Sequence, residues 1–225
     1  MTILCVADHI DPLVYSTQAK ERYKDIDLVL SAGDLPMQYL GFISGSLNKP
    51  VLFVFGNHNL EHYDLFKRRQ FISIDVPETL PQIQNYFGST CIGGRVVKRK
   101  GLLLAGLGGS RRYNAGKNQY TNYQMWLKVM WLIPKLLWNR IRHGRYLDIL
   151  LTHASPKGIH DKPDACHQGF SSFLWFMRRF KPRYLLHGHI HLYDRNEKRE
   201  TQYHDTLVIN VYDHYVLKIE DEPRE

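Results

Sequence analysis

The sequence predicts an α/β (α+β) fold in a single domain that spans residues 1–225. Short apolar runs that are typical of buried strands recur along the chain, and the first two are separated by a segment with helical character. The length lies within the range that one α/β domain covers. Hydrophobic residues make up 44% of the chain and charged residues 23%, which is ordinary for a globular protein with a substantial core.

Three expected strands each end at a polar residue. The strands are the apolar runs 2–7, 26–31 and 51–55. The polar residues that follow them are Asp8, Asp34, Asn57 and His58. Open α/β sheets place their ligands at the carboxyl ends of strands. One aspartate after a strand is usually a helix cap, but the repetition at three strand ends favours a functional site.

The segment after the first strand is expected to begin a helix. Asp11 precedes Pro12, an order typical of a helix N-cap followed by the first helical residue. We therefore expect Asp11 to cap a helix rather than to bind a ligand. Residues 60–90 are expected to form a helix and a loop, with Pro77 and Pro81 as breaks.

A hairpin and a glycine-rich loop are expected in the middle of the chain. The hairpin joins strands 90–97 and 101–107 across a basic turn. The loop that follows carries Arg111 and Arg112, and its backbone amides and guanidinium groups are suited to phosphate recognition. An ordinary flexible loop is the alternative.

A long helix is expected over residues 120–145, kinked or interrupted at Pro134. Much of its surface is apolar, so we expect it to pack against the core. Exposure of these residues would instead indicate a dimer contact or a lid, and a homo-oligomer remains open. The proline and the lack of a clean polar face argue against a membrane surface, so no membrane partner is expected.

Further strands are expected in the second half of the chain. They are expected over 147–152, 183–187, 207–211 and 216–219, with a helix over 170–180. A loop before this helix contains His160, Asp161, Asp164 and His167.

Histidines follow two of these strands. His153 follows the first, and His187, His189 and His191 lie around Gly188 at the end of the second. In a continuing strand, alternate residues share one face. Past a strand end, the glycine would allow a tight turn that aims two imidazoles at one point. Because neutral imidazole is the commonest metal ligand, three histidines in five residues favour a metal site over a surface cluster.

The charge and cysteine content narrow the class of protein. The formal net charge of +8 favours anionic partners such as phosphate esters, nucleotides or nucleic acid. The three cysteines lie far apart and form neither a disulfide framework nor a CxxC pattern, which fits a reducing compartment. No signal peptide and no membrane-spanning run are expected. The sequence therefore predicts a cytoplasmic protein.

The polar strand ends resemble, in order, the motif set of the calcineurin-like metallophosphoesterase family. The motifs are Asp8, Gly33-Asp34, Gly56-Asn57-His58, Thr152-His153-Ala154 and Gly188-His189-Ile190-His191. They span residues 8–191, and five motifs in the correct order are specific although each alone is weak. The resemblance implies two face-packed mixed β-sheets flanked by helices, a four-layer sandwich, with a dinuclear metal site at the strand ends.

The resemblance also implies a role for each motif residue. The implied metal ligands are Asp8, Asp34, Asn57, His153, His189 and His191. Asp34 would bridge both ions, Asp8 and His191 would serve the first ion, and the remaining three would serve the second. His58 would lie beside the substrate phosphate and act in catalysis without binding a metal.

Residue 10 departs from the family pattern, which is usually Asp-x-His at this motif. Ile10 cannot coordinate, so the first ion loses an imidazole ligand. His9, Asp11, water or a substrate oxygen could fill the position, although His9 and Asp11 are offset by one residue and point differently. We therefore expect the first ion to bind more weakly than the second.

These residues together predict a metal-dependent phosphohydrolase that uses a hydroxide activated by two metal ions. A small phosphodiester is the expected substrate, and the oxygen and nitrogen ligands suit manganese, iron, nickel or zinc. Arg111, Arg112 and His160 are candidate substrate contacts. Two alternatives remain open: a nuclease that acts on DNA or RNA, which the basic charge favours, and a non-catalytic scaffold with a degenerate metal site, which Ile10 favours.

Overall fold

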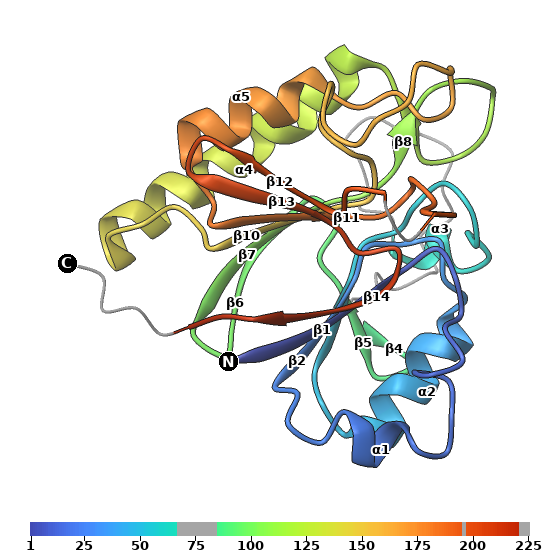
Figure 1. Cartoon of the computed structure of the whole chain (residues 1–225). Coiled ribbons are helices and arrows are strands. Elements are labelled where there is room, and N and C mark those ends of the chain that lie inside the picture. Colours follow the sequence, from blue (N-terminus) through green and yellow to red (C-terminus); the bar gives the residue numbers. More distant parts are fainter. Residues whose placement is uncertain (67–84, 195–196, 221–225) are drawn as a thin grey trace.

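The computed structural model describes residues 1–66, 85–194 and 197–220. In this part of the chain, two six-stranded mixed sheets pack face to face and helices cover their outer sides (Figure 1). The predicted fold class, a four-layer α/β sandwich, is confirmed. Most of the helix and loop expected over residues 60–90, including both prolines, lies outside the described residues.

The first sheet has the strand order β14-β1-β2-β3-β5-β4. Its strands are β1 (Thr2–Ala7), β2 (Leu28–Ser31), β3 (Val51–Phe53), β4 (Asn85–Tyr86), β5 (Ser89–Cys91) and β14 (Asp213–Lys218). The central four strands are parallel, and β14 and β4 pair with them as antiparallel edges. The carboxyl ends of β1, β2 and β3 therefore lie at one edge of the sheet.

The second sheet has the order β12-β13-β11-β10-β7-β6. Its strands are β6 (Arg95–Arg99), β7 (Leu102–Leu107), β10 (Ile149–Thr152), β11 (Tyr184–His187), β12 (Glu200–Tyr203) and β13 (Thr206–Asn210). The predicted hairpin is confirmed as the antiparallel pair β6 and β7, but residues 90 and 91 of its expected first strand belong to β5 in the other sheet. The four central strands are again parallel. A separate short pair consists of β8 (Ser110–Arg111) and β9 (Gln119–Tyr120).

Three apolar clusters correspond to the three interfaces between layers. The helices are α1 (Ala19–Arg22), α2 (Met37–Leu47), α3 (Tyr63–Phe66), α4 (Asn122–His143) and α5 (Ser171–Phe180). In β1, Ile3 and Cys5 face the other sheet, whereas Leu4 and Val6 face α1 and α2. The second sheet packs its outer face on α4 and α5 (Figure 1). Because both faces of each sheet are covered, the strands read as continuous apolar runs in the sequence.

The long helix expected over 120–145 is α4, and its boundaries follow from its capping residues. The Thr121 side chain accepts a hydrogen bond from the Gln124 backbone (3.2 Å), and the Gln124 side chain accepts one from the Thr121 backbone (2.9 Å). Gly144 ends the helix in a left-handed conformation at φ 70°. Pro134 lies inside the helix and does not interrupt it.

Helix α4 has two apolar faces. Met125, Val129, Leu132 and Leu136 pack against the second sheet, as the sequence predicts. The opposite face carries seven exposed apolar side chains, which we call the outer stripe. They are Tyr123, Leu127, Met130, Trp131, Leu137, Trp138 and Ile141. Their spacing of three, four and seven residues places them on one side of the helix. Core packing therefore accounts for one apolar face of α4 and not for the outer stripe.

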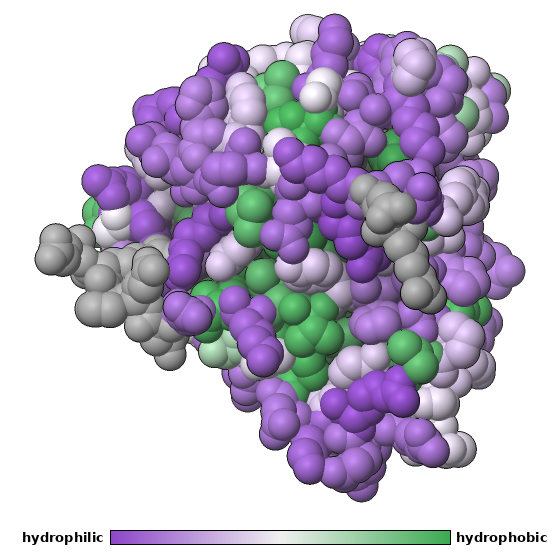
Figure 2. All heavy atoms as spheres, viewed as in Figure 1, coloured by the Kyte–Doolittle hydropathy of each residue, from purple (hydrophilic) through white to green (hydrophobic). Residues whose placement is uncertain are grey.

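The rest of the described surface carries few large apolar groups. The face drawn in Figure 2 is mostly hydrophilic, with hydrophobic residues in separate patches. More than half of the exposed large hydrophobic residues in the described chain belong to the outer stripe. Among the described residues, no helix is long and apolar enough to span a bilayer.

The prediction that Asp11 begins a helix is wrong. The segment after it forms turns, and the first helix begins at Ala19. The Leu13 backbone donates to Asp11 Oδ1 (2.7 Å), and Asp11 Oδ2 pairs with Nδ1 of His214 from β14. Asp11 therefore caps a turn and ties it to the edge strand, a contact between distant segments that the local sequence does not reveal.

Candidate metal centre

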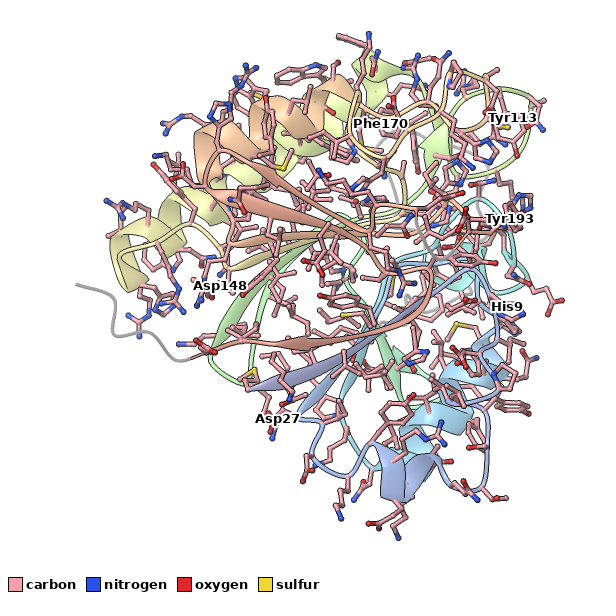
Figure 3. The ribbon with its side chains drawn as sticks, in the orientation of Figure 1. His9, Asp27, Tyr113, Asp148, Phe170 and Tyr193 are labelled. Atoms are coloured by element: carbon pink, nitrogen blue, oxygen red, sulfur yellow. The ribbon has the colours of Figure 1, made fainter. Side chains whose placement is uncertain are left out.

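Five strand ends converge at one edge of the sandwich, where the strands come from both sheets. The segments that follow β1, β2, β3, β10 and β11 deliver Asp8, Asp34, Asn57, His153 and His189. Figure 3 labels three neighbouring side chains, His9, Tyr113 and Tyr193, at this edge on the right of the view. The sequence prediction that polar strand ends gather at one place agrees with this arrangement.

Asp34, His153 and His189 form a compact group, which we call the tight group. One ligand atom from each lies within 4.8 Å of the other two, and all three side chains are buried. His153 Nε2 lies 3.3 Å from Asp34 Oδ2 and 3.2 Å from Asn57 Oδ1. A carboxylate, an amide oxygen and two imidazoles thus face a common point. This donor set suits a divalent transition metal ion.

The two imidazoles are held in place through their outer nitrogens. His153 Nδ1 donates to the Ala32 carbonyl (2.8 Å), and His189 Nε2 donates to the Cys166 carbonyl (2.7 Å). A carbonyl oxygen can only accept, so each of these nitrogens carries hydrogen. His153 Nε2 and His189 Nδ1 remain for a metal. Metal-binding histidines usually have the other nitrogen held in this way, so the residues present fit a metal ion.

Two glycines allow the ligand groups to approach this closely. A Cβ atom on Gly56 would lie 2.0 Å from Asp34 Oδ1 and 2.5 Å from His153 Cε1. A Cβ atom on Gly188 would lie 2.4 Å from Asp8 Oδ2. Any side chain at either glycine would therefore displace a carboxylate of the site.

Three residues of the site have a left-handed backbone. The φ angles are 67° at Asp8, 56° at Asp34 and 66° at His189. This conformation costs a residue with a Cβ atom on the order of 1 kcal/mol, and such residues cluster at functional sites. Each one turns the chain sharply just after a strand.

The groups expected at the first ion converge less closely. Both Asp8 oxygens accept a hydrogen bond from the His189 backbone (3.0 and 2.9 Å), which places that carboxylate beside the tight group. His191 turns toward aromatic residues: its Nδ1 lies 3.0 Å from the Tyr193 hydroxyl, and its ring centroid lies 4.8 Å from that of Tyr212. Of the described residues, neither Asp8 nor His191 belongs to the tight group.

The neighbours of Ile10 that could replace the missing ligand are both engaged. His9 Nδ1 lies 2.7 Å from Asp213 Oδ1. Both Asp11 oxygens are bound, one by a backbone amide and one by His214. Ile10 itself is 39% exposed, so no apolar pocket encloses it.

Burial and mutual charge set the protonation of the site. Burial acts to raise the pKa of Asp34, but the charge and hydrogen bond of His153 outweigh it and lower that pKa. Burial acts to lower the pKa of His153, but Asp34 and then Asp8 raise it. Burial raises the pKa of Asp8 to about 7, with His153 opposing and Asp34 adding to the shift. Burial, followed by the charge of His153, lowers the pKa of His189. Without metal at neutral pH, His153 therefore carries an extra proton and Asp8 is partly protonated.

Metal binding is expected to release protons from His153 and Asp8. The pKa is raised to about 7 at Asp8 and to about 9 at His153, so protons compete with metal at neutral pH and metal affinity should rise as the pH increases from about 6 to 9. We expect up to about a tenfold change per pH unit for each proton displaced. Calorimetric titration in two buffers of different ionisation enthalpy measures this release. Equal apparent enthalpies in the two buffers would contradict it.

His58 lies at the rim of the tight group. Its backbone amide donates to Asp34 Oδ1 (2.7 Å), while its side chain is exposed. The next residue, Asn59, donates from Nδ2 to the Asp34 carbonyl (2.8 Å). Among the described contacts, the His58 imidazole makes no hydrogen bond, so it is free to meet a substrate.

The two arginines of the glycine-rich loop contact other parts of the protein. The Arg111 guanidinium lies 5.7 Å from the centroid of the Phe170 ring, and Arg112 Nη2 donates to Gln124 Oε1 (3.2 Å). Gly109 donates from its backbone to the Phe55 carbonyl (2.8 Å), which fixes the base of the loop beside β3. Both guanidinium groups therefore have partners within the protein.

His160 is engaged through both ring nitrogens. Nδ1 lies 2.9 Å from His187 Nε2, and Nε2 lies 2.9 Å from Thr201 Oγ1. Burial, followed by the charge of Lys198, lowers the pKa of His160 to about 4, so its imidazole is neutral. The structure places His160 and His187 in a packed pair, and among the described residues neither belongs to the tight group that His189 joins.

Two residues near the site were not anticipated from the sequence. The Asn57 side chain donates to the Tyr113 hydroxyl (3.2 Å). Asn118 Nδ2 donates to the Gly56 carbonyl (2.6 Å) and thereby holds the turn that carries Asn57. Tyr113 lies in the glycine-rich loop, so that loop reaches the site through its tyrosine. In the sequence, the neighbouring Arg111 and Arg112 indicated phosphate binding more clearly than Tyr113 did.

The two mixed sheets and the ligand-rich strand ends define the metallophosphoesterase class of folds. One crystal structure has a TM-score of 0.61 and 12% identity, covering 96% of this chain and 94% of its own. The crystal structure of TT1561 of Thermus thermophilus has a TM-score of 0.56 and 14% identity, covering 94% and 89%. A novel archaeal phosphodiesterase has a TM-score of 0.46 and 15% identity, covering 95% and 84%.

The sequence profile of the calcineurin-like phosphoesterases matches residues 1–193, which is most of the chain. The chain therefore belongs to the calcineurin-like phosphoesterase family. Among curated proteins, no match to the sequence was found.

Proposed function

We propose that the protein is a metal-dependent phosphohydrolase that cleaves a small phosphodiester. The arrangement of His153 and His189 carries this proposal. Each imidazole donates its outer N–H to a backbone carbonyl and has its other nitrogen left for an ion beside Asp34. Family membership supports the substrate class, a phosphoester.

The described residues support distinct roles in the reaction. When bound, two divalent ions would supply an activated water and neutralise charge on the phosphoryl oxygens. Asp34 would be shared between the ions, and the His58 backbone amide fixes the position of its carboxylate. The exposed His58 imidazole would donate a proton to the leaving alkoxide oxygen or stabilise charge on the phosphate, an effect typically worth roughly 10²–10⁴ in rate.

We propose a diester rather than a monoester as the preferred substrate. A phosphodiester carries one negative charge, whereas a monoester dianion carries two and gains more from nearby cations. Comparing the rates of cleavage of a diester and a monoester tests this preference.

Hydrolysis of two chromogenic esters tests the proposal. We expect protein stripped of metal by chelation to be inactive, and added manganese or zinc to restore cleavage of bis-(p-nitrophenyl) phosphate more than of p-nitrophenyl phosphate. Turnover that survives chelation would contradict metal dependence. Bound metal without turnover of any ester would favour the scaffold alternative. Faster cleavage of DNA or RNA than of the small diester would favour the nuclease alternative, which the net charge of +8 keeps open.

The substrate role of Arg111 and Arg112 gives a separate prediction. Replacing both by alanine should raise KM for the anionic diester by about tenfold and leave kcat unchanged if their guanidinium groups hold phosphate in the ground state. A matched control is the double alanine variant of Arg178 and Arg179, which removes the same charge from the exposed end of α5. Equal kinetics in both double variants would assign an ordinary structural role to the loop arginines.

A further inference from the structure

The loop between β10 and α5 brings a third imidazole next to the metal centre. The ring centroid of His167 lies 5.4 Å from that of His189, close to the 4.8 Å that separates His153 from His189. The loop is held there by the site itself, because His189 Nε2 donates to the carbonyl of Cys166 (2.7 Å).

The orientation of His167 resembles that of a metal ligand. Its Nδ1 lies 2.8 Å from Asp164 Oδ1, and its backbone amide donates to the same carboxylate oxygen (3.2 Å). An ionised carboxylate accepts hydrogen bonds, so Nδ1 carries hydrogen, and Nε2 has no hydrogen-bond partner among the described residues. Histidines held by a carboxylate through one nitrogen commonly bind metal through the other. His153 and His189 are held in the same manner by carbonyls.

The first ion is the one that lacks the imidazole usual at position 10, which leaves His191 as its one expected imidazole ligand. His9 also has its Nδ1 on a carboxylate, that of Asp213, but its ring lies beside Tyr212 at 6.4 Å. Among the described ring contacts, none joins His9 to His189, whereas His167 lies beside His189. His189 is an expected ligand of the second ion, but its backbone amide holds the Asp8 carboxylate expected at the first ion. The His167 side chain is 35% exposed and that of His9 is 55% exposed, so His167 is also the more enclosed of the two.

We propose that His167, positioned by Asp164, supplies to the first metal ion the imidazole that Ile10 does not provide. His167 Nε2 would bind the ion while Nδ1 keeps its bond to Asp164. The loop would need to move toward Asp8 and His191, because the described structure does not bring these groups into one cluster. This inference rests on the proposed function, since it assigns a ligand to the same centre.

Metal titration with counting of bound metal tests the assignment. In His167→Ala we expect the affinity of the weaker ion to fall by at least about tenfold, with the tighter ion unaffected. Asp164→Asn should weaken the same ion less, because the imidazole remains but is no longer oriented by a charged partner. His9→Ala is the matched control and should bind both ions as the wild type does.

A rescue experiment separates ligand loss from damage to the loop. Adding Ile10→His to His167→Ala should restore the affinity of the weaker ion, because the imidazole returns at the family position. Ile10 is 39% exposed, so the new ring fits without disturbing the core. Failure of this rescue in a double variant that melts like the wild type would overturn the proposal.

Other outcomes would overturn the inference in identifiable ways. Two ions bound with wild-type affinity in His167→Ala would overturn this inference alone, and loss of the weaker ion in His9→Ala would assign the ligand to His9. A thiolate-to-cobalt absorption band that disappears in Cys166→Ser would instead indicate a separate site at Asp164, Cys166 and His167, whose ligand atoms lie within 4.8 Å of one another. Wild-type protein that binds no ion would contradict the proposed function itself.

The outer stripe of α4 carries a second, independent inference. Trp131 and Ile141 are 83% and 81% exposed, and the tryptophans and tyrosine of the stripe are residues enriched where membranes meet water. Two features of α4 argued against binding to a membrane surface, namely its proline and its lack of a clean polar face, and the structure explains both. Helix α4 runs through Pro134, and its other face is covered by the second sheet rather than by water.

The charge around the stripe points to an anionic partner. Helices α4 and α5 contain no aspartate or glutamate, whereas Lys135, Arg140, Arg142, Arg178 and Arg179 are exposed. A second copy of the chain docked through this face would bring two sets of like charges together. A bilayer with anionic headgroups would instead complement both the cations and the apolar side chains.

We infer that the outer stripe binds an anionic lipid surface. The protein should sediment with vesicles of phosphatidylcholine mixed with phosphatidylglycerol, and added salt should weaken this binding. Trp131→Ser combined with Ile141→Ser should lower the partition coefficient at least tenfold. Tyr193→Ser removes an aromatic group that is 80% exposed outside α4 and should have no effect.

Three outcomes would overturn the lipid inference. Wild-type protein that stays in the supernatant with anionic vesicles contradicts it directly. Equal binding to pure phosphatidylcholine would remove the role of the basic residues. A concentration-dependent dimer that the Trp131→Ser, Ile141→Ser variant abolishes would show that a second copy covers the stripe.

Discussion

Alanine at position 34 is expected to abolish binding of the metal pair and to lower kcat by at least about 10⁴-fold, because the ligand shared by both ions is lost. Asp34 also accepts the His58 backbone amide (2.7 Å) and faces His153 Nε2 (3.3 Å). Removing its carboxylate therefore takes away the acceptor of the His58 amide and leaves His153 Nε2 with Asn57 Oδ1 alone (3.2 Å). Bound metal, kcat and the melting temperature should be measured together.

Two further variants make the Asp34 result interpretable. Asp34→Asn keeps an oxygen for the His58 amide but loses the charge, so it should fold normally and still fail to hold two ions. Asp25→Ala makes the same change at an exposed aspartate and should behave as the wild type. Full activity in Asp34→Ala, with two ions per chain, would rule out the bridging role.

His58→Ala is expected to lower kcat by about 10²–10⁴-fold while the metal content stays near that of the wild type. The hydrogen bond from residue 58 to Asp34 comes from the backbone amide, which alanine retains. The change therefore removes the exposed imidazole and leaves the position of Asp34 intact. Measurement of kcat with parallel metal counting separates the two effects.

A matched histidine variant controls for non-specific effects of the His58 change. His143→Ala removes an imidazole at the last residue of α4, a helical position where alanine is well tolerated, and should leave kcat unchanged. If metal is lost in step with activity in His58→Ala, His58 is a ligand and not a group that acts on the substrate.

The fold could be predicted from the sequence because its central strands are buried on both faces. Strands such as β1 and β10 are continuous apolar runs with clear ends. Helix α2 was missed since its eleven residues, Met37–Leu47, include two glycines and give no clean helical period. Edge strand β12, Glu200–Tyr203, is polar and half exposed, so nothing local distinguishes it from a loop.

The candidate site could be predicted in part. The sequence predicted that Asp34, His153 and His189 lie close together, because parallel strands deliver their carboxyl ends to one edge of a sheet. The partners of Asp11 and His160 come from segments far along the chain, His214 and Thr201, and no sequence pattern reveals them. The same holds for the guanidinium of Arg111, which lies over the Phe170 ring.

The most direct test of the metal centre is anomalous diffraction from crystals grown with manganese or zinc. The proposed function predicts a strong peak about 2.0–2.3 Å from an Asp34 oxygen, His153 Nε2 and His189 Nδ1, with a weaker second peak beside Asp8 and His191. The nitrogen assignment is part of the prediction, because His153 Nδ1 and His189 Nε2 donate to carbonyls. A crystal at saturating metal with no peak at the Asp34 group, or with ions bound only elsewhere, would contradict the central claim.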